Sequence, residues 1–464
     1  MSISVVILAA GQGTRMKSNI SKVLHPVGGK KMVLRAVDTA EKITDQRPVL
    51  VVGRDEGQVR GAVGERAQFV TQSVQQGTGH AVEQATDLLR GKTDLVVVFY
   101  ADMPLLRAET LQRLIDAQQD NRGPVTLLTL NSPNTRGFGR IIRDEHGVVI
   151  NIVEEADCTP EQLLIWELNA GVYVFDSVWL WDNLSRLTPK GMNKEYYLTD
   201  MVGLAADQGL PVFGVESDDV DEVIGVNTRV HLSEAEAALR RRVTRHWMLE
   251  GVTILDPATT YIDEDAKIAA ETIILPNTHI QGSKTEIGGH CEIGPNSIIR
   301  DSRIGDHCTV FNSIIEESTL ENYVDIGPFS HLRPGAYLAE HVHMGNFGEV
   351  KNSHVGPYTR MGHFSYIGDA DIGADVNIGA GTITVNFDGL QKNKTVVGDH
   401  AFIGSDTMLI APITVEEDGR TAAGSVVTRD VPSGYIAVGV PARNREYHPL
   451  GSPESNSGDQ NKNQ

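Results

Sequence analysis

The chain has 464 residues and a formal net charge of -20. We therefore expect two or more domains and no nonspecific binding to nucleic acid or to an anionic membrane, because both are held by clustered cations. Its three cysteines, Cys158, Cys291 and Cys308, are widely spaced and predict a reducing, cytoplasmic location rather than a disulfide framework. We also expect neither a signal peptide nor a membrane span, because no apolar run is long enough.

The first half of the chain alternates short apolar, β-branched runs with amphipathic segments. The runs that predict buried strands are residues 4–8, 49–52, 95–99 and 125–128. The segments that predict helices are residues 35–42, 81–90 and 109–118. This alternation predicts an α/β domain with a Rossmann-like, mostly parallel sheet covered on both faces.

The first predicted strand runs into a glycine-rich loop, and residues 8–16 read Leu-Ala-Ala-Gly-Gln-Gly-Thr-Arg-Met. Glycines at such a turn let backbone N–H groups approach a phosphate or a base, and Arg15 and Lys22 supply positive charge. The dinucleotide fingerprint fails because Met16 stands where its third glycine belongs, and the P-loop fails because no Gly-Lys-Ser/Thr follows. The whole string resembles the signature of the sugar-nucleotidyltransferase family, whose members join a nucleoside triphosphate to a sugar 1-phosphate and release pyrophosphate.

Further segments extend this resemblance through the first half. Residues 72–80 look like the family's uracil-recognising loop, and residues 100–104 end a buried strand with a carboxylate where a parallel sheet is expected to bind its ligand. Other segments, residues 138–141, 154, 169–171 and 225–227, are similar to those that hold the sugar. The resemblance implies catalytic roles for Arg15 and Lys22. It also implies contacts with UTP or the UDP-sugar from Leu8, Ala9, Ala10, Gly11, Lys22, Gln72, Gly77, Thr78, Tyr100, Ala101, Asp102, Gly139, Glu154, Asn169 and Asn227.

By the same resemblance, Asp102 and Asn227 would hold Mg²⁺, a hard ion that takes oxygen ligands and bridges phosphates. A phosphate oxygen of the sugar 1-phosphate would attack the α-phosphorus of UTP in line, so no protein nucleophile is required. The alternative for Asp102 is a strand-end carboxylate that caps the next helix. Family members commonly have Pro and Gly where this chain has Ser21 and Ala101.

A six-residue repeat runs from Val252 to Ala442: an aliphatic residue, usually a Gly next, then four mostly small or polar residues. This period predicts an all-β, left-handed parallel β-helix of hexapeptide repeats, with the aliphatic residue pointing inward and the Gly tolerating turn conformations. Residues 290–291 and 307–308 are both His-Cys, at matching places in the repeat, which disfavours a metal site there. Before the repeat, residues 233–236 predict a capping box in the connecting helix.

Several polar segments in the repeat are not explained by the repeat itself: residues 333–336, 345–351, 362–369, 377–381 and 386–389. Together with the N-terminal motifs, they resemble a family of bifunctional bacterial enzymes with glucosamine-1-phosphate acetyltransferase and N-acetylglucosamine-1-phosphate uridylyltransferase activity. The resemblance covers residues 4 to about 441. It implies a second site, in the β-helix, that uses acetyl-CoA.

Arg333 and Lys351 are cations suited to a sugar phosphate, and His363 has an unperturbed pKa suited to a general base. The resemblance implies that His363 deprotonates the sugar amine as it attacks the thioester. By position alone, His363 is one of several histidines in solenoid turns. The other residues implied to hold glucosamine 1-phosphate are Tyr366 and Asn377. Those implied at acetyl-CoA are Ala380, Asn386, Phe387, Lys392, Ser405, Ala423 and Arg443, and Asn386 is also implied near the sugar.

The repeat breaks at residues 382–395, which must loop out of the coil. In the family such loops reach a neighbouring solenoid, which implies a homotrimer. Lys392 and Lys394 on this loop, with Arg443, are the cations expected to bind the phosphates of coenzyme A. The alternative for these three residues is solvated surface charge.

We therefore expect an enzyme that makes UDP-N-acetylglucosamine by acetylating glucosamine 1-phosphate and then uridylylating the product. The expected domains are a uridylyltransferase domain at residues 1–228, a linker helix at 229–250, an acetyltransferase β-helix at 251–450 and a disordered tail at 451–464. One alternative is a single-function sugar-1-phosphate nucleotidyltransferase whose β-helix is structural or regulatory. A second is a non-catalytic scaffold, against which the presence of Arg15, Lys22, Asp102 and His363 argues.

Overall fold

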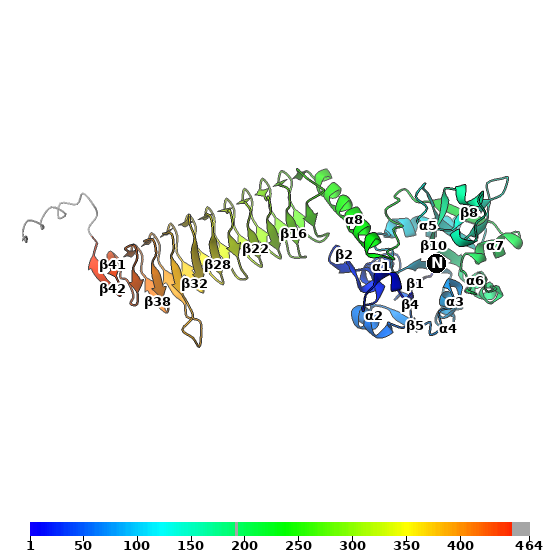
Figure 1. Ribbon diagram of the computed structural model, residues 1–464, viewed down its shortest axis with the longest axis horizontal. Helices are drawn as coiled ribbons and strands as arrows, with labels where there is room; N and C mark the ends of the chain where they lie inside the picture. Colours follow the sequence, from blue (N-terminus) through cyan, green and yellow to red (C-terminus); the bar gives the residue numbers. More distant parts are fainter. Residues whose placement is uncertain (191–193, 448–464) are drawn as a thin grey trace, which may run out of the picture. The chain divides into compact units, whose positions relative to one another are not determined.

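The computed structural model describes residues 1–190 and 194–447, and the predicted tail lies outside these residues (Figure 1). The chain divides into two compact units, the first from Met1 to Leu239 and the second from Arg240 onward. Among the described residues, no helix is long and apolar enough to cross a membrane.

The first unit is built on one mostly parallel sheet, in which the strand order is β11-β7-β10-β6-β1-β4-β5. Strand β10 is antiparallel to both of its neighbours, β6 and β7, and β8 and β9 form an antiparallel pair beside it. The strands are β1 (Ile3–Ala9), β4 (Val49–Val52), β5 (Gln68–Thr71), β6 (Leu95–Tyr100), β7 (Val125–Asn131), β8 (Arg140–Arg143), β9 (Val149–Val153), β10 (Glu167–Asp176) and β11 (Val212–Glu216), with a separate hairpin of β2 (Pro26–Val27) and β3 (Lys30–Lys31). This arrangement confirms the predicted α/β class.

Helices cover both faces of this sheet because its strands are apolar on both sides. Along β1, Val5 and Ile7 belong to one core cluster and Val6 and Leu8 to the other. The first cluster includes side chains of α1 (Met32–Glu41), α2 (Glu56–Val63) and α5 (Ala108–Asp120). The second includes side chains of α3 (Thr78–Glu83), α4 (Thr86–Leu89), α6 (Ser177–Asn183) and α7 (Asp200–Asp207). The single helix predicted at 81–90 is therefore two short helices, α3 and α4.

Short 3-10 turns complete the unit: η1 (Thr14–Met16), η2 (Lys22–Leu24), η3 (Gly64–Arg66), η4 (Glu155–Asp157), η5 (Gln162–Leu164) and η6 (Leu184–Arg186). The connecting helix α8 spans Arg229–Leu249. The capping box predicted at residues 233–236 is wrong, because the helix begins earlier. The Thr228 hydroxyl accepts a hydrogen bond from the His231 amide at 3.2 Å, and this satisfies an N-terminal donor of the helix.

The second unit is a parallel β-helix with three faces, and each strand up to β37 pairs with the strand three places further along the chain. At the end of the first face, β39 pairs with β41, and β41 pairs antiparallel with β42. The first face consists of β12 (Thr253–Ile254), β15 (Ile273–Ile274), β18 (Glu292–Ile293), β21 (Thr309–Val310), β24 (Asp325–Ile326), β27 (His343–Met344), β30 (Arg360–Met361), β33 (Asn377–Ile378), β36 (Phe402–Ile403), β39 (Arg420–Thr421), β41 (Tyr435–Gly439) and β42 (Ala442–Glu446). The second consists of β13 (Tyr261–Ile262), β16 (His279–Gln281), β19 (Ile298–Arg300), β22 (Ile314–Glu316), β25 (His331–Leu332), β28 (Gly348–Lys351), β31 (Ser365–Gly368), β34 (Ile383–Val385), β37 (Met408–Ile410) and β40 (Val426–Val427). The third consists of β14 (Lys267–Ile268), β17 (Glu286–Ile287), β20 (Arg303–Ile304), β23 (Thr319–Leu320), β26 (Tyr337–Leu338), β29 (His354–Val355), β32 (Ala370–Ile372), β35 (Thr395–Val397) and β38 (Ile413–Val415).

The aliphatic residue of each repeat points inward, as predicted. In β18, for example, Glu292 is exposed and Ile293 is buried, and Ile293 lies opposite Ile274 and Val310 on adjacent coils. Such alternation follows from the two-residue period of a strand. This confirms the predicted left-handed β-helix of hexapeptide repeats.

At Gly294 and Gly327, the Gly after the aliphatic residue has the expected left-handed conformation, with φ of 110° and 111°. At most other copies of the repeat it has a different role. Gly379 has no left-handed backbone conformation, but a Cβ there would lie 2.5 Å from the Ser405 amide nitrogen of the next coil. The left-handed position comes two residues after the Gly and is filled by side-chain residues such as His290 and His307, with φ of 57° and 58°. These glycines are therefore required mainly because successive coils approach closely.

One corner of the β-helix carries a column of stacked rings. His290, His307, Tyr323, His341 and Tyr358 stack in this order, with centroids 4.8–4.9 Å apart. The thiols of Cys291 and Cys308 are buried, and they contact backbone carbonyl groups inside the coil. Ring stacking therefore accounts for the two His-Cys pairs seen in the sequence.

Candidate active sites

The first candidate site is a cleft of about 420 Å³ in the first unit. It lies where β1 and β6 end at their carboxyl ends, in Ala9 and Tyr100. The predicted residues that line it are Leu8, Ala9, Ala10, Gly11, Lys22, Gln72, Gly77, Thr78, Tyr100, Asp102, Gly139, Glu154, Asn169 and Asn227. Two predicted residues do not line it. Ala101 is fully buried, and Arg15 is exposed in η1.

Three predicted residues meet at the centre of the cleft. The Lys22 ammonium forms an ion pair with Asp102 and donates a hydrogen bond to Asn227 Oδ1 at 2.9 Å. The Asp102 carbonyl also accepts from the Val226 amide at 2.9 Å, which keeps the segment before Asn227 beside it. The two side-chain oxygens thus converge on one cationic group. An oxygen pair of this kind suits a hard divalent ion.

The loop after β5 forms one wall of the cleft. Gln72 Nε2 donates to the Gly77 carbonyl at 2.9 Å, and the Thr78 hydroxyl accepts from the Leu198 amide at 2.9 Å. Gly77 has a φ of 103°, and a Cβ there would lie 2.5 Å from the Tyr196 carbonyl oxygen. Only Gly fits this position, so the Gly in the predicted uracil loop has a local structural reason.

The opposite wall carries Glu154, which accepts a hydrogen bond from the Thr199 hydroxyl at 2.9 Å. Burial raises the pKa of Glu154 above its usual value, and burial beside Glu154 and Asp102 raises the pKa of Tyr100. Asn169 donates to the Tyr173 hydroxyl at 2.7 Å, next to an irregularity in β10. This wall therefore presents hydrogen-bonding groups at fixed positions, which suits a hydroxylated ligand.

Sequence reasoning missed several residues that line the cleft. Thr199 and Glu195 come from the chain after η6, and Gln75 donates a hydrogen bond to the Ala10 carbonyl. Thr199 and Glu195 belong to no glycine-rich or strand-end motif, so no local pattern indicated them. Gln75 lies within the predicted loop of residues 72–80 but was not named as a site residue. The remaining lining residues that were not named individually as site residues are Val23, Ala81, Met103, Gly137, Phe138, Ala170, Gly171 and Gly225. Of these, Met103, Phe138, Ala170, Gly171 and Gly225 lie in segments that the sequence resemblance had indicated.

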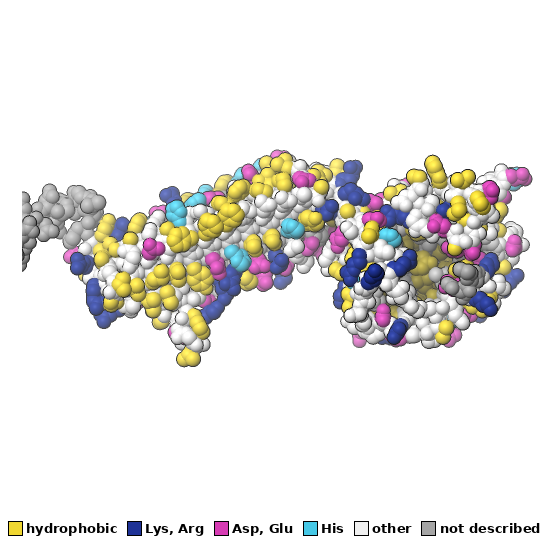
Figure 2. Space-filling model, viewed as in Figure 1, with side chains coloured by type: hydrophobic (Ala, Val, Ile, Leu, Met, Phe, Trp, Pro, Cys, Tyr) yellow, Lys and Arg dark blue, Asp and Glu magenta, His cyan; other side chains and the backbone are white. Residues whose placement is uncertain are grey.

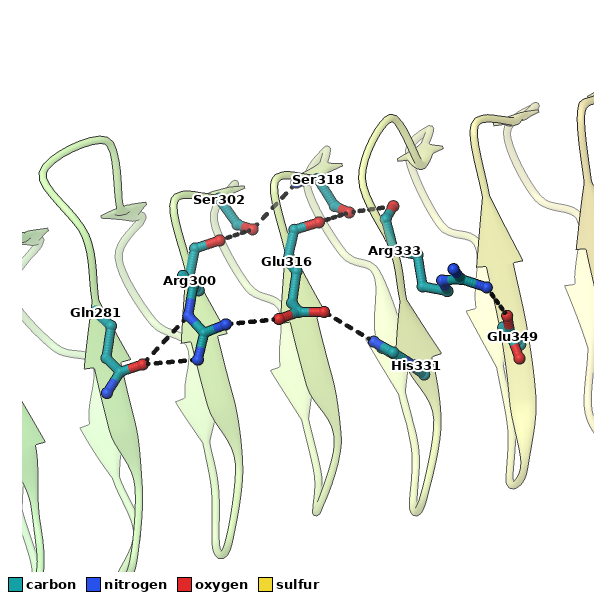
Figure 3. Close-up of polar contacts among 8 residues, drawn as sticks. All are labelled: Gln281, Arg300, Ser302, Glu316, Ser318, His331, Arg333 and Glu349. Atoms are coloured by element: carbon teal, nitrogen blue, oxygen red, sulfur yellow. Dashed lines mark hydrogen bonds and ion pairs between the residues drawn. The ribbon is translucent and has the colours of Figure 1, made fainter.

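The second candidate site is a group of cations on the second face of the β-helix. Arg333 donates to Glu349 Oε1 at 2.8 Å (Figure 3). Lys392 and Arg333 lower the pKa of Lys351, with Lys392 contributing more. The pKa of Lys351 is lowered because its charge lies beside other cations, and such a concentration of positive charge favours a bound anion. Figure 3 also shows that Glu316 pairs with Arg300 on the preceding coil and with His331 on the following coil.

Beside these cations, the predicted polar residues contact one another. Asn386 Nδ2 donates to Asp369 Oδ2 at 2.5 Å and lies 3.4 Å from the Tyr366 hydroxyl oxygen. Lys392 Nζ lies 3.8 Å from Asp369 Oδ2. The projecting loop is residues 386–394, shorter than the predicted 382–395, because Ile383–Val385 form β34 within the coil and Thr395 begins β35. It returns to the face that carries Tyr366.

Four other predicted residues lie in one column at the corner between the first and second faces. His363, Ala380, Ser405 and Ala423 occupy corresponding turns of successive coils. Backbone hydrogen bonds join these turns: Gly381 N to Phe364 O at 2.7 Å, Asp406 N to Ala380 O at 2.6 Å and Gly424 N to Ser405 O at 2.8 Å. His363 is exposed. The column therefore presents one imidazole and a row of small residues to a ligand that runs along the corner.

The remaining predicted residues are not brought into this group within one chain. Asn377 lies on the first face, opposite Arg360 and Phe402, whereas Tyr366 lies on the second. Arg443 lies in β42, at the last strand of the first face. Phe387 is exposed on the projecting loop. The three residues extend from different parts of the β-helix.

The chain is similar to known proteins along most of its length. Residues 5–151 match the MobA-like NTP transferase domain family. A bifunctional protein GlmU of Shouchella clausii is 43% identical over 443 residues, which cover 96% of this chain and 97% of that protein. Those of Brevibacillus brevis and Enterococcus faecalis are 43% and 45% identical over 448 and 446 residues, covering 97% and 96% of this chain and 96% of each of those proteins.

The fold and the sites define a bifunctional transferase, with a nucleotidyltransferase unit followed by a hexapeptide-repeat acyltransferase unit. The chain belongs to the GlmU family. The predicted family, fold class and bifunctional enzyme class are therefore confirmed.

Proposed function

We propose that the first unit transfers UMP from UTP to N-acetylglucosamine 1-phosphate and releases pyrophosphate. The observation that carries this proposal is the convergence of Lys22, Asp102 and Asn227 at the carboxyl ends of the strands. A sugar phosphate oxygen attacks the α-phosphorus in line, and the pyrophosphate leaves from the opposite side. Lys22 compensates the negative charge of the phosphates, and Arg15 is the second cation proposed for the leaving group.

Asp102 and Asn227 would hold Mg²⁺, and they fit it because their oxygens already converge on one cation. The ion would bridge and partly neutralise the phosphates. Gln72, Gly77 and Thr78 would hold the base, whereas Gly139, Glu154 and Asn169 would hold the sugar. The last three all line the cleft.

The β-helix is proposed to transfer an acetyl group from acetyl-CoA to glucosamine 1-phosphate. Arg333 and Lys351 would bind the phosphate, with Tyr366 and Asn377 on the sugar. His363 would remove the proton from the attacking amine, and the thiolate of coenzyme A would leave. The Ala380 amide would face the oxyanion and Ser405 would lie near the amine.

Acetyl-CoA is proposed to lie along the corner column. Ala380, Ser405 and Ala423 follow one another there on successive coils, and their small side chains leave room for an extended chain. Asn386, Phe387 and Lys392 would contact it from the projecting loop. Arg443 is proposed to bind one of its phosphates.

We propose that the protein works as a homotrimer, because Asn377 and Tyr366 lie on different faces of one chain. Figure 2 shows hydrophobic side chains gathered on the surface of the β-helix. Next to the His363 column, Phe329, Phe347 and Phe364 are 57%, 59% and 56% exposed. Apolar rings at this exposure favour a protein interface.

We also propose a cytoplasmic location, in keeping with the free thiols.

The test is to follow the two half-reactions separately on purified full-length protein. Asp102→Ala should abolish Mg²⁺-dependent formation of UDP-N-acetylglucosamine and leave acetyl transfer intact. His363→Ala should lower acetyl transfer about 10²–10⁴-fold and leave uridylylation of pre-acetylated sugar phosphate intact. Wild-type protein that uridylylates but never acetylates would instead support a single-function nucleotidyltransferase.

A further inference from the structure

We propose that the first turns of α8 are a positioning element of the uridylyl-transfer site, and that Glu236 is its positioning residue. The inference rests on the proposed function of the first unit. All the contacts on which the inference rests lie within that unit, between residues 22 and 239. Glu236 was expected only to cap a helix, and the structure gives its carboxylate a different partner.

The first contact joins α8 to the segment that carries Lys22. Lys22 begins η2, and the hairpin of β2 and β3 follows within a few residues. At the tip of this hairpin, the Gly28 amide donates to Glu236 Oε1 at 2.9 Å. Gly28 has a φ of 57°, and a Cβ there would lie 2.3 Å from Leu239 Cδ2. The hairpin tip is therefore packed directly against α8.

The second contact joins the same helix to the segment that carries Asn227. The Asn227 amide donates to His231 Nδ1 at 3.4 Å, and the Thr228 hydroxyl accepts from the His231 amide. The Leu232 amide donates to the Thr228 carbonyl at 3.0 Å. Asn227 therefore continues without interruption into the first turn of α8.

These two contacts hold the two segments whose side chains, Lys22 and Asn227, meet in the cleft. Lys22 and Asn227 are far apart in the sequence, yet Lys22 Nζ and Asn227 Oδ1 are 2.9 Å apart. The first three turns of α8 are rigid compared with the loops that they join. Because both segments are attached to α8, the helix sets the spacing between the ammonium and the amide oxygen.

A change in the spacing between Lys22 and Asn227 should affect the chemical step. A displacement of about 1 Å in a group that must face the reacting phosphate is enough to lower a rate by as much as about 10²-fold. Among the described residues, Glu154 and Asn169 on the sugar wall form hydrogen bonds with Thr199 and Tyr173, and not with Glu236 or Gly28. Loss of Glu236 should therefore lower kcat and leave the KM for the sugar phosphate unchanged.

The experiment compares Glu236→Ala with Glu236→Gln in the full-length protein. Glu236→Ala should lower kcat for uridylyl transfer about 10-fold or more, with less than about a twofold change in KM for N-acetylglucosamine 1-phosphate. Its Gly28 amide should exchange with deuterium faster than in the wild type. Glu236→Gln keeps a carbonyl oxygen for the Gly28 amide and should restore most of kcat and of the protection.

The matched control is Asp176→Ala. Asp176 also accepts a backbone hydrogen bond with its carboxylate, from Trp179 at 2.8 Å, but at the start of α6 and outside the residues that line the cleft. It should lower stability without changing kcat. Acetyl transfer should be unchanged in all three variants, because it takes place in the other unit.

The inference is overturned if Glu236→Ala keeps wild-type kcat, or if Glu236→Gln is as impaired as Glu236→Ala. If Asp176→Ala loses as much kcat as Glu236→Ala, the loss is explained by general destabilisation of the protein. That result would also overturn the inference. If the wild-type protein itself shows no uridylyl transfer, the proposed function fails, and the exchange of the Gly28 amide still tests the contact.

Discussion

Glu154 is a carboxylate whose surroundings oppose its charge. Burial raises its pKa, and the hydrogen bond from Thr199 only partly counters this. The folded protein therefore binds a proton at Glu154 more tightly than the unfolded chain does. Stability falls as the pH rises from the ordinary value of 4.5 through the raised value, because the charged form is then buried.

Glu154→Gln should accordingly stabilise the protein without ligand at pH 7, by about 2–4 °C in Tm. The neutral amide keeps an acceptor for Thr199 and carries no buried charge. The gain should vanish when the pH is lowered towards 4.5, where Glu154 takes up its proton. Calorimetry at several pH values measures this, and a gain that is independent of pH would contradict the assignment. The same variant should raise the KM for the sugar phosphate if Glu154 holds the sugar.

The proposed binding of coenzyme A by cations leads to a second prediction about single residues. Replacing Lys392 and Arg443 together by Ala should raise the KM for acetyl-CoA about 10-fold, because each loses a charge-assisted contact with a phosphate. The KM for UTP should not change, and the defect should shrink with a dephospho-coenzyme A thioester. Lys267→Ala is the control, since Lys267 pairs with Glu286 on an early coil. An equal effect in the control would contradict the assignment.

The prediction of individual site residues was the least complete part of the sequence reasoning. Motif residues such as Lys22 and Asp102 were found because a glycine-rich loop and a strand end precede them. Thr199 reaches the cleft only through the tertiary fold, so no local signal could indicate it. The expected placement of Arg15 in the cleft is not seen, because it lies exposed in η1.

At the scale of elements, the glycines of the β-helix show how close packing sets the repeat. A Cβ at Gly398 would lie 2.4 Å from the Glu417 amide nitrogen of the next coil, whereas a Cβ at Gly362 would meet only His343 Nε2, at 3.9 Å. Both glycines occupy a turn after an inward-pointing residue. The space available at the two positions therefore differs although the sequence pattern is the same.

Gly398→Ala should therefore destabilise the β-helix by about 1–3 kcal/mol, because backbone atoms of adjacent coils must separate. Gly362→Ala is the matched control and should cost less than about 1 kcal/mol. Urea unfolding of the two variants measures the difference. Equal losses would show that conformational freedom of the Gly, rather than contact between coils, decides the repeat.

Elements were predicted well wherever a period was strong. The six-residue period predicted the β-helix, because each inward residue stacks on its equivalent in the next coil. The start of α8 was predicted incorrectly, since the Ser-Glu-Ala-Glu string of residues 233–236 imitates a cap that Thr228 in fact supplies. Glu236 uses its carboxylate for the hairpin instead, and a tertiary contact of this kind leaves no local pattern.

For the whole molecule, the exposed rings beside the His363 column predict the oligomeric state. Light scattering should give the mass of a trimer, and Phe347→Asp should lower it, because a charge replaces a ring that is 59% exposed in the single chain. Acetyl transfer should fall with assembly, and uridylyl transfer should persist. Glu65→Asp, in η3 of the first unit, is the control substitution. Full acetyl transfer by a monomer would contradict the trimer.

The domain boundaries at residues 228 and 250 remain predictions. If the contact between Glu236 and Gly28 matters as proposed, a first unit that ends at residue 228 lacks part of its own support. A unit that extends through Leu239 retains it.

The last strand of the first face, β42, lies antiparallel to β41 and exposes Arg443, Arg445 and Glu446. A stack of parallel coils would otherwise finish in an unpaired strand with free amide and carbonyl groups, which could pair with the first coil of another molecule. Reversal of the chain direction and the charges along this edge oppose such pairing. We therefore expect the hairpin to limit end-to-end association of the coils, and its loss should lower solubility before it lowers catalysis.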